Sequence, residues 1–337
     1  MTASLEGAAA GRGAAAKPVA TRGRMPDFFV VGHAKSGTTA LYEMLREQPA
    51  IFMPDVKEPW YFVPELRAPV PRGNADRHPH TLDGYLALFA DARADQRVGE
   101  ATPSYLLSHE AAARIAAARP DARIVAILRE PASFLRSLHL QFLQTDVETE
   151  TDLGRAIALE DERRAGRSLP RNSTRPQALM YSEHVRYVEQ LQRYHAVFAP
   201  EQILVLIYDD FRADNAATVR RVLRFLDVED VSPIVAAEVN PTVQIRSPRV
   251  HGLVRSLYMG RGRVARALKA AVKAVTPRRL RRDALRTFRR RVLYGKPLPA
   301  DEPLMLELRR KFKDEVVALG EYLERDLVTL WGYDRIG

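Results

Sequence analysis

Short runs of apolar residues recur along the chain, each followed by a polar turn and then by apolar positions three or four residues apart. Three of these runs, at 28–31, 124–128 and 203–208, contain no alternating polar residues. Such runs are typical of strands that a sheet buries on both faces. A short apolar stretch at 51–53 and a strand-to-loop passage at 98–106 add two candidate strands. The pattern predicts an α/β fold with three layers, in which helices flank a central, mostly parallel sheet of about five strands.

Apolar spacings of three and four residues predict the helices. One helix begins near Thr38, and the others cover the ranges 82–89, 111–118, 181–198, 215–226 and 301–331. The last range is expected to turn one continuous apolar stripe toward the core. The stripe consists of Leu304, Leu308, Phe312, Val316, Leu319, Leu323, Leu327 and Leu330. The charged run 160–164 is expected to be a solvated helix face.

The composition is ordinary for a soluble protein. The chain has 337 residues, of which 46% are hydrophobic and 28% are charged, and it has no cysteine. The absence of cysteine excludes disulfides and thiolate chemistry, and it fits a cytoplasmic location. No run reaches the roughly 18 apolar residues of a membrane span. The first 26 residues lack the apolar segment of a signal peptide, so we expect a disordered tail at 1–26 and one domain at 27–337.

The net charge of +10 is concentrated in one segment. Between Arg246 and Lys296 there are 17 Lys or Arg residues and one acidic residue, so this segment carries about +16 and the remainder about −6. Apolar residues at helical intervals predict that 246–296 is a basic helical segment. The body of the protein is therefore mildly acidic.

A glycine-flanked turn follows the first predicted strand. Four residues separate Gly32 from Gly37, and a helix begins directly afterwards. Such a loop points several backbone N–H groups at one position beside a helix N-terminus, which makes it an anion site, most often for phosphate. In nucleotide P-loops a lysine follows the second glycine, but here Thr38 takes that position and Lys35 lies inside the loop. We therefore expect the lysine to meet a different atom of the ligand.

The residues Lys35-Ser36-Gly37-Thr38-Thr39 resemble the phosphosulfate loop of sulfotransferases that use 3′-phosphoadenosine 5′-phosphosulfate. The resemblance implies a P-loop-like fold, in which these five residues bind the 5′ end of the donor. It also implies that the lysine stabilises the negative charge that develops on the leaving oxygen as sulfur departs.

A second segment resembles the carbohydrate-type members of the same family. Lys57-Glu58-Pro59 precedes three aromatic residues, and in that family the glutamate is the general base, which maps onto Glu58. Proline disfavours a helical conformation for the residue before it, so we expect the carboxylate to project from a loop. The passage 99–105 matches another family pattern, Gly-Glu-x-Thr-Pro-x-Tyr. His33, inside the glycine-flanked turn, is an alternative base.

Arg129 stands at the carboxyl end of the 124–128 strand, the edge at which open α/β sheets bind ligands. Its guanidinium offers a fork of donors suited to phosphate, and the hydroxyl of Ser137, eight residues later, offers another. This spacing after a strand, with Pro131 two residues beyond the arginine, resembles the family's site for the 3′-phosphate of the donor.

Three interpretations of the basic segment stay open. Because the family often closes the donor site with a late basic loop, Arg246 and Arg249 are expected to contact the 3′-phosphate. The rest, 250–296, either attracts a polyanionic acceptor or contacts an anionic membrane. Nucleic acid is disfavoured as a partner because no recognised nucleic-acid fold accompanies the charge.

The resemblance covers about residues 27–335 and implies a sulfotransferase of the carbohydrate or heparan-sulfate type. It implies transfer from 3′-phosphoadenosine 5′-phosphosulfate to a hydroxyl or amine of a glycan, glycolipid or natural-product acceptor, without a metal. The range 145–176 is expected to be an acceptor-side insertion, and a peripheral position at the inner membrane surface is compatible with 250–296. A P-loop kinase or NTPase and a non-catalytic polyanion-binding protein are the alternatives.

Overall fold

Five parallel strands form the central sheet, in the order β2–β3–β1–β4–β5. The computed structural model describes residues 23–67, 78–170, 175–229, 234, 244–245, 294–295 and 299–336. The predicted fold class is confirmed. The strands are β1 Phe28–Gly32, β2 Ile51–Phe52, β3 Arg97–Ala101, β4 Arg123–Leu128 and β5 Ile203–Ile207.

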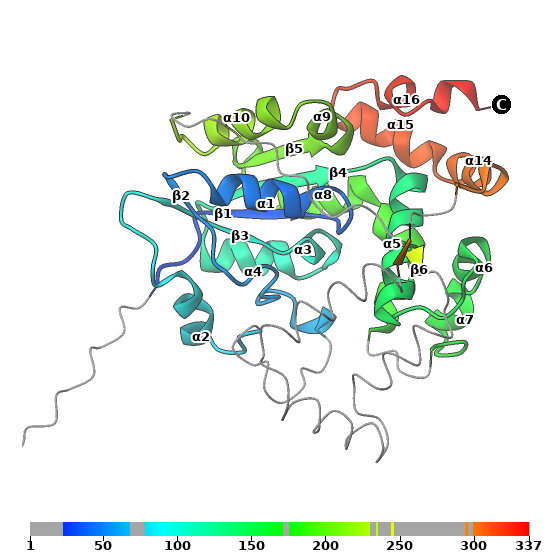
Figure 1. Cartoon of the computed structure of the whole chain (residues 1–337), viewed down its shortest axis with the longest axis horizontal. Helices are drawn as coiled ribbons and strands as arrows, with labels where there is room; N and C mark the ends of the chain where they lie inside the picture. The colour runs from blue at the N-terminus through cyan, green and yellow to red at the C-terminus, as the bar shows by residue number, and fades with distance from the viewer. Residues whose placement is uncertain are drawn as a thin grey trace, which may run out of the picture.

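Side chains of the central strands alternate between two apolar clusters, one on each face of the sheet. Phe28 and Val30 of β1 join one cluster, and Phe29 and Val31 join the other. All four are fully buried, as the uninterrupted apolar run predicts. Figure 1 shows the strands between α1 and α4, which lie on opposite faces.

Helices cover both faces of the sheet. One face carries α1 Thr38–Arg46, α9 Tyr208–Ala213 and α10 Asn215–Phe225. The other face carries α3 Ser104–Leu107, α4 Ala111–Ala118, α5 Pro131–Thr145 and α8 Tyr187–His195. The predicted 82–89 helix divides into α2 Leu82–Leu86 and the 3₁₀ turn η3 Ala87–Phe89, and the predicted 181–198 helix divides into η5 Tyr181–Val185 and α8.

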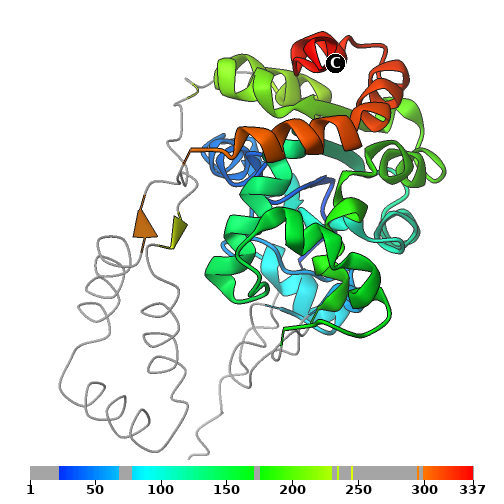
Figure 2. The same ribbon diagram turned by 90° about the vertical axis from the view of Figure 1, so that its right-hand side faces the viewer.

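The predicted 301–331 helix is three helices, α14 Glu302–Lys311, α15 Lys313–Tyr322 and α16 Leu327–Leu330. Its expected apolar stripe is largely buried, but Leu330 is 42% exposed, so that part of the prediction is wrong. The side chain fails to reach the core because the helix ends at this residue. Figures 1 and 2 show these helices in orange and red, and α14 packs against α5 while α15 packs against α8. Arg325, between α15 and α16, forms a bidentate ion pair with Asp210 of α9 at 2.5 and 2.7 Å.

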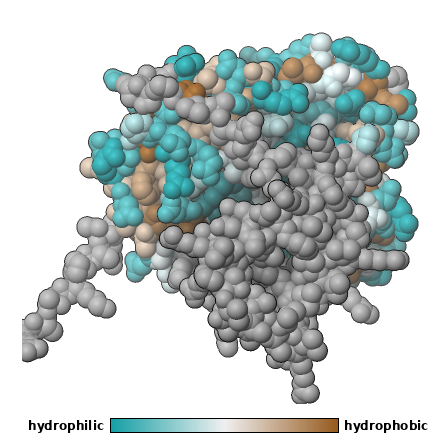
Figure 3. Space-filling view, viewed as in Figure 1, coloured by the Kyte–Doolittle hydropathy of each residue, from teal (hydrophilic) through white to brown (hydrophobic). Residues whose placement is uncertain are grey.

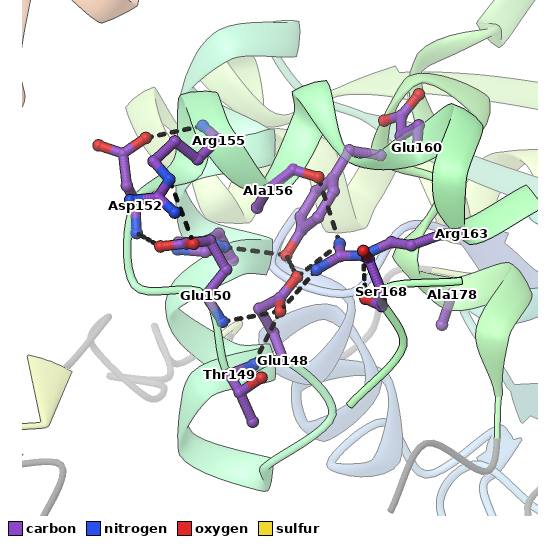
Figure 4. A network of polar contacts seen from close by, with 12 residues as sticks. Glu148, Thr149, Glu150, Asp152, Arg155, Ala156, Glu160, Arg163, Ser168 and Ala178 are labelled. Carbon is purple, nitrogen blue, oxygen red and sulfur yellow. Dashed lines mark hydrogen bonds and ion pairs between the residues drawn. The ribbon is translucent and has the colours of Figure 1, made fainter. Parts of the chain in front are cut away.

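The range 145–176 begins at the end of α5 and contains α6 Leu153–Ala158 and α7 Glu160–Arg164. The expectation of a solvated face at 160–164 is wrong for two residues, since Glu160 and Arg163 are buried. Arg163 forms a bidentate pair with Glu148 at 2.8 and 2.9 Å, and Figure 4 shows the surrounding polar network. A charge run in the sequence does not reveal such a partner, because Glu148 lies 15 residues earlier, in an irregular segment.

The remaining described elements are short. They are the 3₁₀ turns η1 Pro64–Leu66, η4 Pro176–Leu179, η6 Pro200–Gln202 and η8 Tyr333–Arg335, and the antiparallel pair β6 Gln244–Ile245 and β7 Tyr294–Gly295. Residues 1–22 of the expected tail 1–26 lie outside the described residues, whereas 23–26 are described and Arg24 pairs with Asp27 at 3.4 Å. Apart from Tyr294 and Gly295 of β7, the expected basic segment 246–296 also lies outside the described residues. In the described part of the chain no helix is long and apolar enough to cross a membrane. Figure 3 shows a mostly hydrophilic coloured surface with apolar residues in small patches.

Candidate active site

The turn between β1 and α1 adopts the backbone of an anion-binding loop. Gly32 and Gly37 have φ values of 133° and 88°, and Lys35 is also left-handed, at 70°. A side chain at Gly37 would be strained, and its Cβ would lie 3.0 Å from the ring of Phe211. The backbone N–H of Ser36 donates to the carbonyl of His33 at 3.2 Å, which closes the turn.

Polar groups in this loop lack protein partners. Gly37 occupies the N-cap of α1, and no side chain of the described residues caps the helix, so its first N–H groups are free to bind an anion. The hydroxyl of Ser36 is fully buried without a hydrogen-bond partner. Thr38 and Thr39 form the first turn of the helix. A buried, unpaired hydroxyl beside uncapped N–H groups fits a phosphate, whose oxygens accept from both.

Two cations meet at this loop. Arg129, directly after β4, donates from Nη1 to the carbonyl of Lys35 at 2.9 Å. Burial lowers the pKa of Lys35, and the neighbouring Arg129 lowers it further. Burial also lowers the pKa of Arg129, whose guanidinium lies 4.8 Å from the ring centre of Tyr208. The structure thus brings together the two cations that the sequence places 94 positions apart.

The acidic side chains near Arg129 are engaged elsewhere. Glu130 accepts from the backbone of Ala132 and Ser133 at the start of α5 and from the hydroxyl of Tyr333 at 2.6 Å. Asp209 accepts from the indole N–H of Trp331 at 2.9 Å. Within the described residues, no carboxylate forms an ion pair with Lys35 or Arg129.

The other candidate phosphate ligands are only partly described. Ser137 is buried on α5, two turns after Arg129 along the chain. Arg246 and Arg249 lie outside the described residues. Among the described residues, no group of three or more His, Asp or Glu side chains could hold a metal ion.

Glu58 lies in a loop, as its position before a proline predicts, but its left-handed backbone conformation is not what a following proline favours. It has a φ of 62°, and Trp60 on the far side of Pro59 has a φ of 60°. Left-handed conformations of such residues cost about 1–3 kcal/mol each and gather at functional sites. The Glu58 N–H donates to the carbonyl of Ala101 at 3.1 Å, which ties the loop to the end of β3. Its carboxylate, 37% exposed, pairs with Lys57 at 2.6 Å.

A cavity of about 170 Å³ connects the two parts of the site. The start of the anion loop, at His33 and Ala34, and the Glu58 loop both line it. One face of α5 forms a wall, because its lining residues are spaced three and four apart. Those residues are Phe134, Leu138, Gln141, Phe142 and Thr145. The structure therefore places Glu58 at the same cavity as the loop that carries Lys35.

His33 is a packed residue and a poor candidate base. Its Nε2 lies 2.7 Å from Oε1 of Gln190, whose own amide N–H donates to the carbonyl of Glu183. Gln190 thus presents an oxygen, so Nε2 carries the hydrogen of the neutral ring. Burial lowers the pKa of His33 to about 3. A base this weak gives little driving force for proton removal.

Glu100, in the 99–105 passage, is part of the support beneath the Glu58 loop. It is fully buried and accepts from the hydroxyls of Tyr85, Thr102 and Tyr105 at 2.5, 2.5 and 3.0 Å. Burial raises its pKa to about 7. The passage places Tyr105 inward, where it also accepts from the backbone N–H of Phe62.

Sequence reasoning missed Arg175, which lines the cavity with Glu58. Its guanidinium carbon lies 5.1 Å from the ring centre of Trp60. Arg175 comes from a polar stretch with no motif, more than 100 residues after the loop that it meets. Only an aromatic residue next to the Lys-Glu-Pro segment hinted at a cation partner.

Comparisons with known proteins agree on one family. The profile of the "Sulfotransferase family" matches residues 26–233. Carbohydrate sulfotransferase 15 of Mus musculus is 26% identical over 253 residues, and heparan sulfate glucosamine 3-O-sulfotransferase 3A1 of Mus musculus is 26% identical over 211 residues. Each match covers 62% of this chain but 45% and 47% of the relatives, so the chain spans about half the length of these curated relatives.

A solved bacterial structure is also similar. The sulfotransferase from Alicyclobacillus acidocaldarius is 31% identical, with a TM-score of 0.55. The match covers 65% of this chain and 87% of that protein. The sheet and its flanking helices are therefore common to both proteins.

Proposed function

This chain belongs to the sulfotransferase family, and we propose that it transfers a sulfuryl group from 3′-phosphoadenosine 5′-phosphosulfate to a hydroxyl or amine of an acceptor. The acceptor is a glycan, a glycolipid or a natural product. Glu58 acts as the general base, and no metal takes part.

One observation carries the proposal: two half-buried cations meet at a helix N-terminus that no side chain of the described residues caps, beside a cavity lined by a carboxylate. Lys35 and Arg129 have no carboxylate partner within the described chain, and the Ser36 hydroxyl is unpaired. A phosphorylated ligand would supply the missing counter-charge and acceptors. Glu58 faces the cavity next to this loop, where an acceptor hydroxyl can approach.

The chain's own residues divide the work of the reaction. The loop N–H groups, Thr38 and Thr39 hold the 5′-phosphate, while Arg129 and Ser137 hold the 3′-phosphate. Glu58 takes the proton from the acceptor as its oxygen or nitrogen forms the new bond to sulfur. The bond between sulfur and the 5′-phosphate oxygen breaks, and Lys35 stabilises the charge left on that oxygen.

Calorimetry without Mg²⁺ tests the donor site. We expect adenosine 3′,5′-bisphosphate to bind to the full chain and ATP to bind much more weakly. Lys35→Met and Arg129→Met should weaken the binding, because each removes one phosphate cation. Tight, Mg²⁺-dependent ATP binding would instead support a P-loop kinase or NTPase.

A variant of Glu58 tests the base. Glu58→Gln should lower kcat by about 10²–10⁴-fold and leave the affinity for adenosine 3′,5′-bisphosphate unchanged, because it removes proton transfer but not charge recognition. Activity is measured with ³⁵S-labelled donor against a panel of glycans, glycolipids and small hydroxylated molecules. Glu65→Gln is a matched control in a neighbouring turn, and unaltered turnover in both variants would remove Glu58 from the mechanism.

A further inference from the structure

We propose that Arg175 and Trp60 form a subsite for an anionic group of the acceptor, and that the acceptor is a small molecule whose apolar body joins this anion to the hydroxyl that Glu58 deprotonates. The inference rests on the proposed function and specifies its substrate class. It separates this chain from the glycan sulfotransferases to which it is similar.

Arg175 has unused hydrogen-bonding capacity at the cavity. Burial lowers the pKa of its guanidinium, and the nearby Glu58 opposes that effect. Its Nε is buried without a hydrogen-bond partner. The ring of Trp60 supports the guanidinium from one side, an arrangement that leaves the donor edge of the planar fork available.

The neighbouring charges leave this cation unpaired. Glu58 carries its own partner, because Lys57 contacts the carboxylate at 2.6 Å. The two histidines that line the cavity are neutral, since burial lowers the pKa of His33 to about 3 and that of His184 to about 4. Among the described lining residues, Arg175 is therefore the one cation, and an anion in the cavity is drawn to it.

The rest of the wall selects an apolar body. Phe134, Leu138 and Phe142 of α5 face the cavity, and Leu66 and Leu107 line it from η1 and α3. The described lining also includes Ser104, Gln141 and Thr145. A sugar hydroxyl that faced the apolar side chains instead of these groups would lack a hydrogen-bond partner, which is unfavourable. The volume of about 170 Å³ suits a ligand the size of one substituted ring.

The test uses matched pairs of phenols that differ in one charge. The full chain is supplied with ³⁵S-labelled donor and with 4-hydroxybenzoate, 4-hydroxyphenylacetate or 3-(4-hydroxyphenyl)propanoate, each beside its methyl ester. 4-Hydroxybenzylphosphonate distinguishes a carboxylate from a phosphate-type anion, and a neutral disaccharide represents glycans. We expect at least one acid to exceed its ester in kcat/KM by about 10- to 100-fold, the range of a hydrogen bond to a charged group.

Variants of Arg175 assign the preference. Arg175→Met should raise KM for the acid by about 10- to 100-fold, with little change in kcat and little change for the ester. Arg175→Lys should keep part of the preference, because the charge remains but the planar fork is lost. Arg164→Met, at an exposed arginine of the same insertion, is the control and should leave the preference unchanged.

Several outcomes overturn the inference. They are equal kcat/KM for every acid and its ester, turnover of the disaccharide alone, no turnover of any phenol, and an Arg175→Met effect equal on acid and ester. Binding of adenosine 3′,5′-bisphosphate is measured in parallel. If it is retained, such a result removes only the acceptor assignment, whereas its absence in the unaltered protein removes the proposed function as well.

Discussion

Two regions of this protein take cations out of water, and they do so in opposite ways. In the range 145–176, Arg163 is 3% exposed and donates to both oxygens of the buried Glu148. At the β1–α1 loop, Lys35 and Arg129 are largely covered but form no ion pair with a carboxylate of the described chain. Arg163 thus pairs directly with its counter-charge, whereas neither Lys35 nor Arg129 forms such a pair among the described residues.

The network around Glu148 is saturated. Its carboxylate also accepts from the backbone N–H groups of Thr149 and Glu150, and from Tyr181 at 3.3 Å. Figure 4 shows Thr149, Glu150 and Arg163 around the carboxylate of Glu148. Both oxygens of this carboxylate are therefore hydrogen-bonded within the described residues. The pair holds α7 against the segment that follows α5, since Arg163 belongs to α7 and Glu148 to that segment.

The loop shows the reverse pattern, in which burial lowers the pKa of both cations and Ser36 has no partner. Desolvating a charge without pairing it is unfavourable, so this arrangement lowers the stability of the ligand-free protein. We therefore propose a ligand-binding role for the charges at the α1 N-terminus and a structural role for the Arg163–Glu148 pair. The same replacement in each region should separate the two roles.

Arg163→Met should have the largest effect on stability. It leaves Glu148 buried without its counter-charge, so we expect the free energy of unfolding to fall by about 3–5 kcal/mol in urea denaturation. The double variant Glu148→Leu/Arg163→Met should recover much of the loss, because no charge is then left unpaired. A loss below about 1 kcal/mol in the single variant would contradict a structural role.

Lys35→Met should have the opposite profile. We expect kcat to fall by about 10²–10³-fold, because the charge on the leaving oxygen loses its cation. Thermal unfolding of the donor-free variant should occur at the same temperature or higher, since the lowered pKa shows that the folded protein disfavours the charged lysine. Marked destabilisation would mean that Lys35, like Arg163, has a hidden partner.

Glu100 adds a third case to the comparison, a buried carboxyl group that accepts hydrogen bonds from three hydroxyl groups and forms no ion pair among the described residues. Its pKa is about 7 in the folded protein, above the ordinary 4.5. Between these two pH values the carboxyl is protonated in the folded state and ionised in the unfolded state. Its contribution to stability is complete below pH 4.5 and is lost as pH rises to about 7, by roughly 3 kcal/mol at most. The difference between the unaltered protein and Glu100→Gln, measured by urea denaturation across pH 4–8, should show this slope. A flat difference would mean that Glu100 titrates normally.

An exposed ion pair should have the smallest effect on stability among these predictions. Arg114 and Glu110 lie one helical turn apart on α4, with side chains about half exposed. Because water screens such pairs, Arg114→Ala should change the free energy of unfolding by less than about 0.5 kcal/mol and leave turnover unchanged. A loss comparable to that of Arg163→Met would show that burial is not what separates the regions.

Local pattern sufficed for the parts of the molecule in which neighbours in sequence are neighbours in space. The uninterrupted apolar run of β4 and the glycine spacing before α1 predicted the sheet and the loop correctly. The same reasoning failed for Arg163, because the run of charged residues around it predicted an exposed side chain and the side chain is buried. It also failed to find Arg175, since no motif surrounds that residue.

The sequence by itself determined the strands, the glycine-flanked turn and the chemical identity of the residues around it, because backbone conformation and apolar periodicity depend on nearby residues. Tertiary structure alone decided which charges are paired. Arg129 donates to the carbonyl of Lys35, and Arg163 pairs with Glu148. The Nε of Arg175, which lines the same cavity as Glu58, has no hydrogen-bond partner among the described residues. Pairing depends on distances between segments far apart in the chain, and these distances exist only once the helices pack on the sheet.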